Sequence, residues 1–145
     1  MKEIQGNIWN WHDAGAYIVV PTNGYVKKNG ECVMGRGIAR QAAIKFPNLP
    51  KELGRAIMHT GNRVYVFDGL RIITFPVKHN WWERADPELI EKSANELRDG
   101  IYIALDELVV MPRVGCGNGR LSWAVVKPIL ERCLRGVSNL VVCYL

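Results

Sequence analysis

The most informative part of the chain is a glycine-rich stretch, residues 112–123, which reads PRVGCGNGRLSW. It follows an apolar run, Glu107 to Met111, that is typical of a buried strand and ends at Pro112. After it, Ser122 can cap a last helix, although Pro128 should leave the first turn of that helix bent or irregular. Glycines let a backbone approach a ligand closely, and free N–H groups beside a helix N-terminus attract phosphate oxygens. The stretch therefore predicts a strand, a ligand-binding turn and a helix.

A second glycine-rich turn, Val33-Met34-Gly35-Arg36-Gly37, occupies an equivalent position earlier in the chain. It follows a short apolar strand, Ala16 to Val20, and a polar loop from Pro21 to Gly35. A helix with one apolar stripe should come next, from Arg36 to Phe46. Ligands of open α/β sheets lie beyond the carboxyl ends of the strands, so two such turns suggest a diphosphate or nucleotide site. The alternative is that both are merely tight strand-to-helix turns.

The rest of the chain alternates strands and helices. Asp68-Gly69 predicts a hairpin turn, Asp86 with Pro87 is typical of a helix start, and Gly100 should weaken the middle of that helix. The other expected elements are a strand at Glu3–Asn10, a helix at Lys51–Met58, strands at Arg63–Phe67 and Leu70–Phe75, a helical stripe of Ile90, Ala94, Leu97, Ile101 and Ala104, and a strand at Asn139–Tyr144. The alternation predicts a three-layer α/β/α domain with a central mixed sheet.

Length and composition indicate a single globular domain that covers residues 1–145. Of these residues 48% are hydrophobic and 23% charged, so the chain can bury a core without a disulfide or a metal. Its four cysteines form no C-x-x-C pair, no apolar run approaches a membrane span, and the N-terminus lacks a signal-peptide core. We therefore expect a cytoplasmic protein with no membrane partner. The net charge of +5 is compatible with an anionic partner, but the basic residues are scattered.

Two common nucleotide-binding motifs are absent. A dinucleotide fingerprint would need glycine where Arg120 stands, and no βα unit follows that could supply the acidic ribose ligand. A P-loop would need Gly-Lys-Ser or Gly-Lys-Thr, which the chain lacks. His12, His59 and His79 have no metal-ligand spacing, so we expect neither a metal nor a cofactor.

Three segments together resemble a macrodomain over essentially the whole chain. They are the loop from Asn23 to Gly35, the segment Phe75-Pro76-Val77-Lys78, and residues 112–123 with the sequel Val126-Lys127-Pro128-Ile129. The pattern Pro-x-x-Gly-Cys-Gly followed by Leu-x-Trp is most similar to the branch that contains the DarG antitoxin, which removes ADP-ribose from DNA. The terminal ADP-ribose protein glycohydrolase of animals belongs to the same branch. The resemblance implies a domain that binds ADP-ribose.

The resemblance also assigns the parts of ADP-ribose to residues of this chain. The adenine should lie near Gly6-Asn7-Ile8, where the amide oxygen of Asn7 replaces the usual aspartate as acceptor of the adenine amino proton. Tyr144 should stack on the adenine. The implied diphosphate loop comprises Gly115, Cys116, Gly117, Asn118 and Gly119, continued by Arg120 and Leu121, and the implied ribose loop comprises Met34, Gly35, Arg36 and Gly37 with Asn23 close by.

Lys78 is the residue that the resemblance implies for catalysis. In the related branch, a lysine after the central strand acts at the anomeric carbon of the distal ribose. A partly desolvated amine has a lowered pKa, which suits a nucleophile or a base. The alternatives for Lys78 are a solvated side chain and a phosphate contact. The animal enzyme adds an aspartate in the second loop, but here the pair is Asn118-Gly119, which favours a nucleobase over a protein carboxylate as the modified group.

For the remaining candidate side chains, we expect packing or solvent exposure rather than contact with a ligand. Cys116 lies beside a helix N-terminus, where a thiolate is favoured, but packing beneath the loop is the expected role. Trp81 and Trp82 could stack on a base at the pocket rim, and we expect one of them to cover the core instead. The Lys27-Lys28 pair either contacts a phosphate backbone or is solvated.

We therefore expect a macrodomain that hydrolyses an ADP-ribosyl linkage, with ADP-ribosylated DNA, and hence single-stranded DNA, as its partner. Two alternatives stay open. One is a non-catalytic module that binds ADP-ribose, and the other is a phosphatase that acts on ADP-ribose 1″-phosphate. A cognate ADP-ribosyltransferase toxin is the candidate protein partner.

Overall fold

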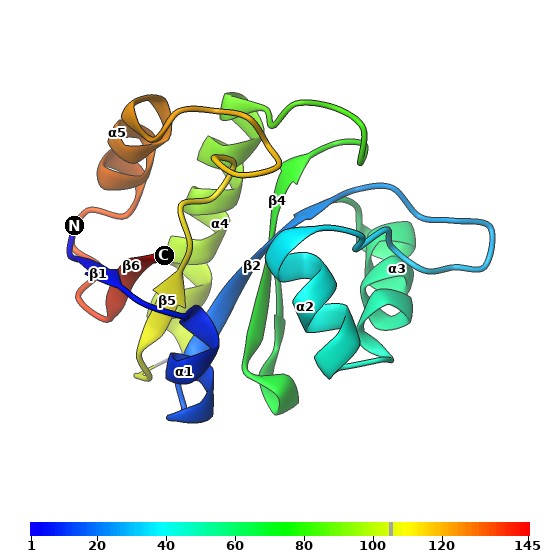
Figure 1. The fold of residues 1–145 in the computed structure, drawn as a ribbon, viewed down its shortest axis with the longest axis horizontal. Helices are drawn as coiled ribbons and strands as arrows, with labels where there is room; N and C mark the ends of the chain where they lie inside the picture. The colour runs from blue at the N-terminus through cyan, green and yellow to red at the C-terminus, as the bar shows by residue number, and fades with distance from the viewer. Residues whose placement is uncertain (105) are drawn as a thin grey trace.

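Six strands form one sheet in the order β1-β6-β5-β2-β4-β3, with helices on both faces (Figure 1). The computed structural model describes residues 1–104 and 106–145. Neighbouring strands are parallel except for β3 and β4. The described elements are β1 (Glu3–Gln5), α1 (Ile8–Asp13), β2 (Tyr17–Asn23), α2 (Gly37–Lys45), α3 (Leu49–Thr60), β3 (Tyr65–Phe67), a 3₁₀ turn (Asp68–Leu70), β4 (Ile72–Lys78), α4 (Pro87–Ala104), β5 (Val109–Met111), α5 (Trp123–Cys133) and β6 (Leu140–Tyr144).

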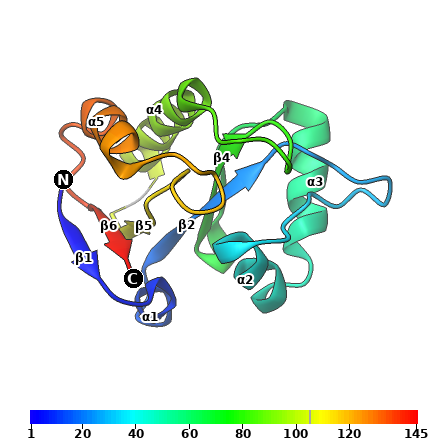
Figure 2. The ribbon, with the colours of Figure 1, turned by 45° about the horizontal axis from the view of Figure 1, so that its top comes forward.

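The central strands are buried on both faces, which gives the domain two separate hydrophobic cores. In β2, Tyr17 and Val19 belong to the core beneath α4 and α5, whereas Ile18 and Val20 belong to the core beneath α1, α2 and α3. Figure 2 shows α4 and α5 on one side of the sheet and α1 and α2 on the other. The predicted three-layer α/β/α fold with a mixed sheet is confirmed.

Three strands end at residues other than those predicted, and one of them is β4, which runs to Lys78 instead of ending at Phe75. The expected strand from Glu3 to Asn10 ends at Gln5, because the side chain of Asn7 accepts a hydrogen bond from Trp9 N at 3.0 Å and starts helix α1. Strand β2 does not stop at Val20 but continues through Pro21 to Asn23. A proline removes only its own N–H from the ladder, and its fixed φ is compatible with an extended chain.

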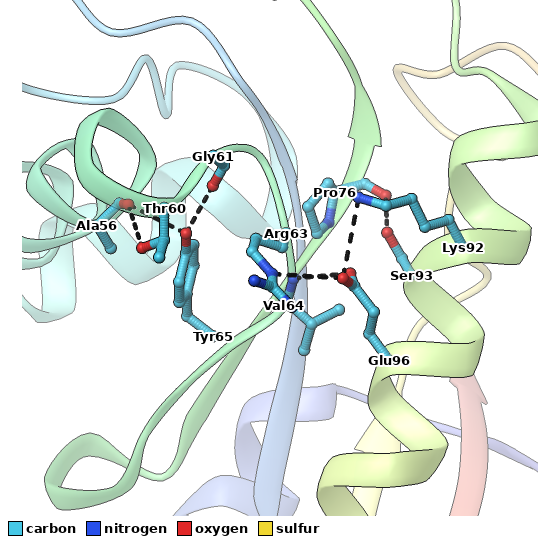
Figure 3. Close-up of polar contacts among 10 residues, drawn as sticks. All are labelled: Ala56, Thr60, Gly61, Arg63, Val64, Tyr65, Pro76, Lys92, Ser93 and Glu96. Carbon is cyan, nitrogen blue, oxygen red and sulfur yellow. Dashed lines mark hydrogen bonds and ion pairs between the residues drawn. The ribbon is translucent and has the colours of Figure 1, made fainter.

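The predicted hairpin between β3 and β4 is confirmed, with a different turn. A single 3₁₀ turn connects the strands, and the residue with positive φ is Arg71 rather than Asp68 or Gly69. Figure 3 shows how helix α4 is tied to this hairpin. The buried hydroxyl of Ser93 donates to Pro76 O at 2.7 Å, and Glu96 accepts from Val64 N at 3.2 Å.

The last two helices follow the prediction with two corrections, which concern Pro128 and Ser122. Asp86 caps α4 by accepting from Glu88 N at 2.9 Å, and α5 runs without interruption through Pro128. Ser122 occupies the N-cap position of α5, but its side chain makes no capping hydrogen bond. Ile90, Ala94 and Leu97 pack in the core as expected, whereas the side chains of residues 101–105, including Ile101 and Ala104, lie outside the described part.

We predict that Gly54→Ala destabilises the fold by about 1–3 kcal/mol, the usual cost of overpacking. A Cβ on Gly54 in α3 would come within 1.9 Å of the backbone oxygen of Gly30, so helix and loop would have to separate. Urea unfolding measures the change. Gly69→Ala is the matched control, because a Cβ there meets no atom within 4 Å, and equal stability of the two variants would contradict this packing.

Candidate functional site

A cavity of about 770 Å³ opens at the carboxyl ends of β2, β4 and β5. After β2 the chain turns to α2 on one face of the sheet, and after β5 it turns to α5 on the other (Figure 2). The two loops diverge at neighbouring strands, which leaves a crevice between them. Its volume is within the usual range for small-molecule sites.

The cavity brings together most of the residues predicted for the site. The lining includes Asn23, Met34, Gly35, Arg36, Gly37, Lys78, Gly115, Gly117, Asn118 and Gly119. Outside the lining are Asn7, Ile8, Cys116, Arg120, Leu121 and Tyr144. The two glycine-rich loops therefore face one space, as expected for two loops at the same edge of the sheet.

The lining carries positive charge and no carboxylate, although Arg113 is paired with Glu3 and Lys27 with Glu31, both outside the lining. Its ionisable side chains are Lys27, Arg36, Lys78 and Arg113, together with the tyrosine hydroxyl of Tyr25, and no aspartate or glutamate is among the described lining residues. A concave site with one sign of charge concentrates ligands of the opposite sign. The electrostatics of the cavity therefore suit an anionic ligand.

Lys78 is the last residue of β4, and its side chain is buried, with 6% of its surface exposed. A register shift between Thr22 and Asn23 pairs Asn23 with Lys78 across the strands. The amine donates a hydrogen bond to Trp81 O at 3.3 Å. Burial lowers the pKa of Lys78 below its ordinary value, and the positive charges of Arg120 and Arg36 lower it further. This environment favours the neutral, nucleophilic form of the amine.

The first loop is held by the side chain of Asn23. Its Nδ2 donates to Val33 O at 2.9 Å and its Oδ1 accepts from Tyr25 N at 2.9 Å, so this amide joins both ends of the loop. Gly24 N also donates to His79 O at 3.1 Å, which ties the loop to the segment after Lys78. Asn23 thus fixes the shape of the loop, and its predicted contact with the ribose stays a prediction.

The second loop contains glycines of two kinds. Gly119 cannot accept a side chain, because a Cβ would lie 2.5 Å from Gly115 O and 2.8 Å from the Cβ of Ala85. Gly115 has a φ of +76°, and a Cβ there would lie 2.8 Å from the Cδ1 of Ile90. Gly117 is different, since a Cβ on it meets no atom within 4 Å. Gly115 and Gly119 shape the loop, whereas Gly117 leaves space in the cavity.

Arg113 is a lining residue that the sequence prediction missed. Its guanidinium lies 4.3 Å from the ring centroid of Tyr144 and 5.2 Å from that of Trp123. Its Nη2 donates to Glu3 Oε1 at 3.0 Å, and Glu3 also accepts from Trp123 and Lys127. The hydrogen bond from Lys127 is the main cause that keeps the pKa of Glu3 below its ordinary value. The only sequence signal for Arg113 was its place inside the glycine-rich stretch.

The structure also bears on the roles predicted for Asn7, Tyr144, Cys116 and the two tryptophans. The Asn7 oxygen predicted to accept from adenine already caps α1, and one face of the Tyr144 ring is covered by Arg113. Their contacts with adenine stay predictions. Burial raises the pKa of the Cys116 thiol, which agrees with a packing role rather than a reactive thiolate. Trp81 and Trp82 are both exposed, so the expectation that one of them covers the core is wrong.

In the described part of the chain, no three histidine, cysteine, aspartate or glutamate side chains come together as metal ligands. Nor does any described helix have the length and apolarity required to cross a membrane.

Comparisons with known proteins point to one family, although no protein-family model matches the chain. A curated relative from Thermus aquaticus, named DNA ADP-ribosyl glycohydrolase, is 28% identical over an alignment of 117 residues that covers 74% of this chain. The chain spans only 32% of that relative.

Solved structures agree with this similarity. The macrodomain of Thermus aquaticus DarG is 25% identical with a TM-score of 0.77, over 99% of this chain and 95% of that one. The macrodomain of Mycobacterium tuberculosis DarG is 26% identical with a TM-score of 0.74, over 88% and 86%. Thermosipho africanus DarTG, solved in complex with ADP-ribose, shares the fold at 21% identity and a TM-score of 0.72, over 88% of this chain and 37% of that one.

We predict that Lys78→Met raises Tm by about 2–4 °C near neutral pH, because a buried cation beside Arg36 and Arg120 is replaced by an apolar chain of similar length. The pKa of Lys78 in the folded protein lies below 10.5. Burial of the protonated amine therefore lowers the stability of the fold fully at pH values below that pKa, and this loss of stability decreases as pH rises toward 10.5. The gain should therefore shrink with rising pH. Thermal unfolding at several pH values measures this gain in Tm. If the gain were the same at every pH, burial of a protonated amine could not be its cause.

Proposed function

Because the chain is a macrodomain of the DarG type, we propose that its cavity binds ADP-ribose and that Lys78 cleaves an ADP-ribosyl linkage. The proposed substrate is ADP-ribosylated DNA. The observation that carries this proposal is the buried amine of Lys78 in a cavity whose described lining also holds Lys27, Arg36 and Arg113 and no carboxylate. Such a site attracts the diphosphate and provides a nucleophile next to it.

The glycine-rich loops give the ligand an orientation. We place the diphosphate against the loop from Gly115 to Gly119, where Gly117 leaves room for it. The distal ribose then lies between the loop from Met34 to Gly37 and Lys78, all of which line the cavity. The adenine end extends toward Arg113, the lining residue next to Tyr144.

In this arrangement, the neutral amine of Lys78 attacks the anomeric carbon of the distal ribose. A carbon–nitrogen bond forms, the bond to the modified base breaks, and the electron pair of that bond goes to the departing base. The proton lost by the amine neutralises the base. Water then releases ADP-ribose from the lysine and restores the amine. A lysine whose pKa is lowered by burial is suited to such covalent catalysis.

One feature favours a nucleobase as the modified group, and a second is compatible with it. The pair Asn118-Gly119 provides no carboxylate beside Lys78, so the site resembles the DarG branch rather than the animal enzyme that acts on proteins. The net charge of +5 is compatible with a polyanionic substrate. The curated relative is named for activity on DNA, but this chain spans only 32% of its length, so its whole activity is not transferred.

Two other functions fit the same cavity. A pure ADP-ribose-binding module uses the same loops without turnover, and a phosphatase for ADP-ribose 1″-phosphate places the phosphate beside Lys78. Similarity to a toxin–antitoxin protein solved with ADP-ribose also makes an ADP-ribosyltransferase toxin the candidate protein partner. We rank these below the glycohydrolase, because a reader has no use for a buried amine with a lowered pKa, and such an amine is a weaker phosphate ligand than an ordinary, exposed lysine.

We predict that calorimetry will show binding of one ADP-ribose per chain, and that Gly117→Glu lowers the affinity by at least about tenfold. The new carboxylate projects into open space, so the fold tolerates it, but its charge repels the diphosphate. Gly117→Gln is the matched control for size and Gly117→Ala for the backbone. Unchanged affinity of Gly117→Glu would place the diphosphate elsewhere.

We predict that Lys78→Ala binds ADP-ribose within a few-fold of wild type, yet loses turnover of ADP-ribosylated single-stranded DNA by at least about 100-fold. Lys78→Arg should fail as well, because a guanidinium stays protonated and cannot act as nucleophile or base. Wild-type turnover should also fall as pH drops below the lowered pKa of Lys78, since protonation removes the nucleophile.

A substrate panel distinguishes the alternatives. It contains ADP-ribosylated DNA, ADP-ribosylated protein and ADP-ribose 1″-phosphate. Binding without turnover of any of them supports the reader, and phosphate release supports the phosphatase. Full activity of Lys78→Ala would contradict the lysine mechanism.

A further inference from the structure

Three aromatic side chains form a continuous exposed cluster at the rim of the cavity. Tyr25, Trp81 and Trp82 are 37%, 49% and 55% exposed. Their rings meet edge to face, with centroids 5.6 Å apart for Tyr25 and Trp82 and 5.5 Å apart for Trp81 and Trp82. Three large exposed aromatic side chains gathered beside a cavity are typical of an interaction site. We refer to these three residues as the aromatic rim.

The aromatic rim is held in place before any ligand binds. Gly24 N donates to His79 O at 3.1 Å, which joins the loop that carries Tyr25 to the loop that carries both tryptophans. At its far end the tryptophan loop is fixed by Asp86 N, which donates to Val77 O at 2.8 Å. Val33 N donates to Tyr25 O at 3.0 Å. A partner that binds here therefore loses little free energy in ordering the rim.

The rim lies on the path of the group that the reaction releases. Tyr25 and Trp81 line the cavity together with Lys78, and the Lys78 amine donates to the backbone oxygen of Trp81. Since Tyr25 and Trp81 line the same cavity as the amine, we place the modified base beside these rings and the strand that carries it over the rim. Trp82 does not line the cavity, so it can contact only what lies outside it.

The charges around the rim select among possible partners. Lys27, Arg36, Arg84 and Arg120 are all exposed, and Arg84 joins the tryptophan loop to the second glycine-rich loop by donating to Arg120 O at 3.0 Å. Of the nearby acids, Glu31 is paired with Lys27 and Asp86 with His79, whereas Glu83 of the tryptophan loop has a carboxylate oxygen without a hydrogen-bond partner in the described structure. Aromatic rings flanked by cations are the usual means of binding unpaired bases on a phosphate backbone.

We propose that the aromatic rim stacks on unpaired bases next to the modified nucleotide, and so selects single-stranded nucleic acid as the substrate. This inference rests on the proposed function. Duplex DNA does not fit, because its bases are already stacked on each other and present no free face. A folded protein does not fit either, because it offers no series of flat rings joined by anionic groups.

The test compares two substrates that share the reacting bond. One is ADP-ribosylated thymidine mononucleotide, and the other is an ADP-ribosylated single-stranded oligonucleotide of about ten nucleotides, the site size of such channels. For Trp82→Ala we expect KM of the oligonucleotide to rise about tenfold, while KM of the mononucleotide and Kd of ADP-ribose stay within twofold of wild type. Trp82→Phe should recover most of the loss. Met58→Ala, which removes an exposed side chain of α3 outside the cavity lining, is the control.

A second measurement keeps this inference separate from the proposed function. Fluorescence anisotropy with an unmodified single-stranded oligonucleotide tests the rim without Lys78 or ADP-ribose, and we expect Trp82→Ala to bind it more weakly than wild type. Failure of wild type to bind ADP-ribose would defeat the proposed function alone. The rim proposal fails if Trp82→Ala treats both substrates as wild type does, if duplex binds as well as single strand, or if only ADP-ribosylated protein depends on Trp82.

Discussion

The divergence of the chain after β2 and β5 is the constraint on which the rest of the site depends. These strands are neighbours, but their loops lead to helices on opposite faces of the sheet. A crevice must therefore remain between the loops, and no side-chain packing from either helix layer can close it. Lys78 stands at the end of the next strand, β4, so the same geometry brings its amine to the crevice without any special turn.

Several features around the crevice lower the stability of the fold, and the two hydrophobic cores compensate for this loss. A buried amine near Arg36 and Arg120, a lining without carboxylates, and glycines that accept no side chain all lower stability. Around them, the first loop is held by Asn23, the tryptophan loop by backbone hydrogen bonds at both ends, and Arg113 by Glu3. Rigid support of this kind is what a site needs if it is to bind a ligand without reorganising.

Much of this architecture could be predicted from the sequence, because it depends on local signals. Glycines, prolines and apolar periodicity identified both loops, the hairpin and the order of the layers. The failures have physical reasons. Asn7 looked like part of a strand because its capping bond to Trp9 involves a helix only six residues long. The exposure of both Trp81 and Trp82 depends on how two loops distant in sequence meet, which no local pattern encodes. Arg113 was missed because its partners, Glu3 and Tyr144, are brought to it only by the sheet.

The network around Glu3 also has a consequence for the order of folding. Glu3 lies on β1, whose only neighbour in the described sheet is β6, and its partners Arg113, Trp123 and Lys127 are more than a hundred residues away along the chain. Contacts between such distant residues form late, because a long loop must close first. On the ribosome, β1 waits unpaired until β6 has been synthesised, and only then can Glu3 and Tyr144 hold Arg113 at the cavity. A nascent chain that ends before β6 therefore lacks the contacts that hold Arg113 at the cavity, even when most of its sheet is in place.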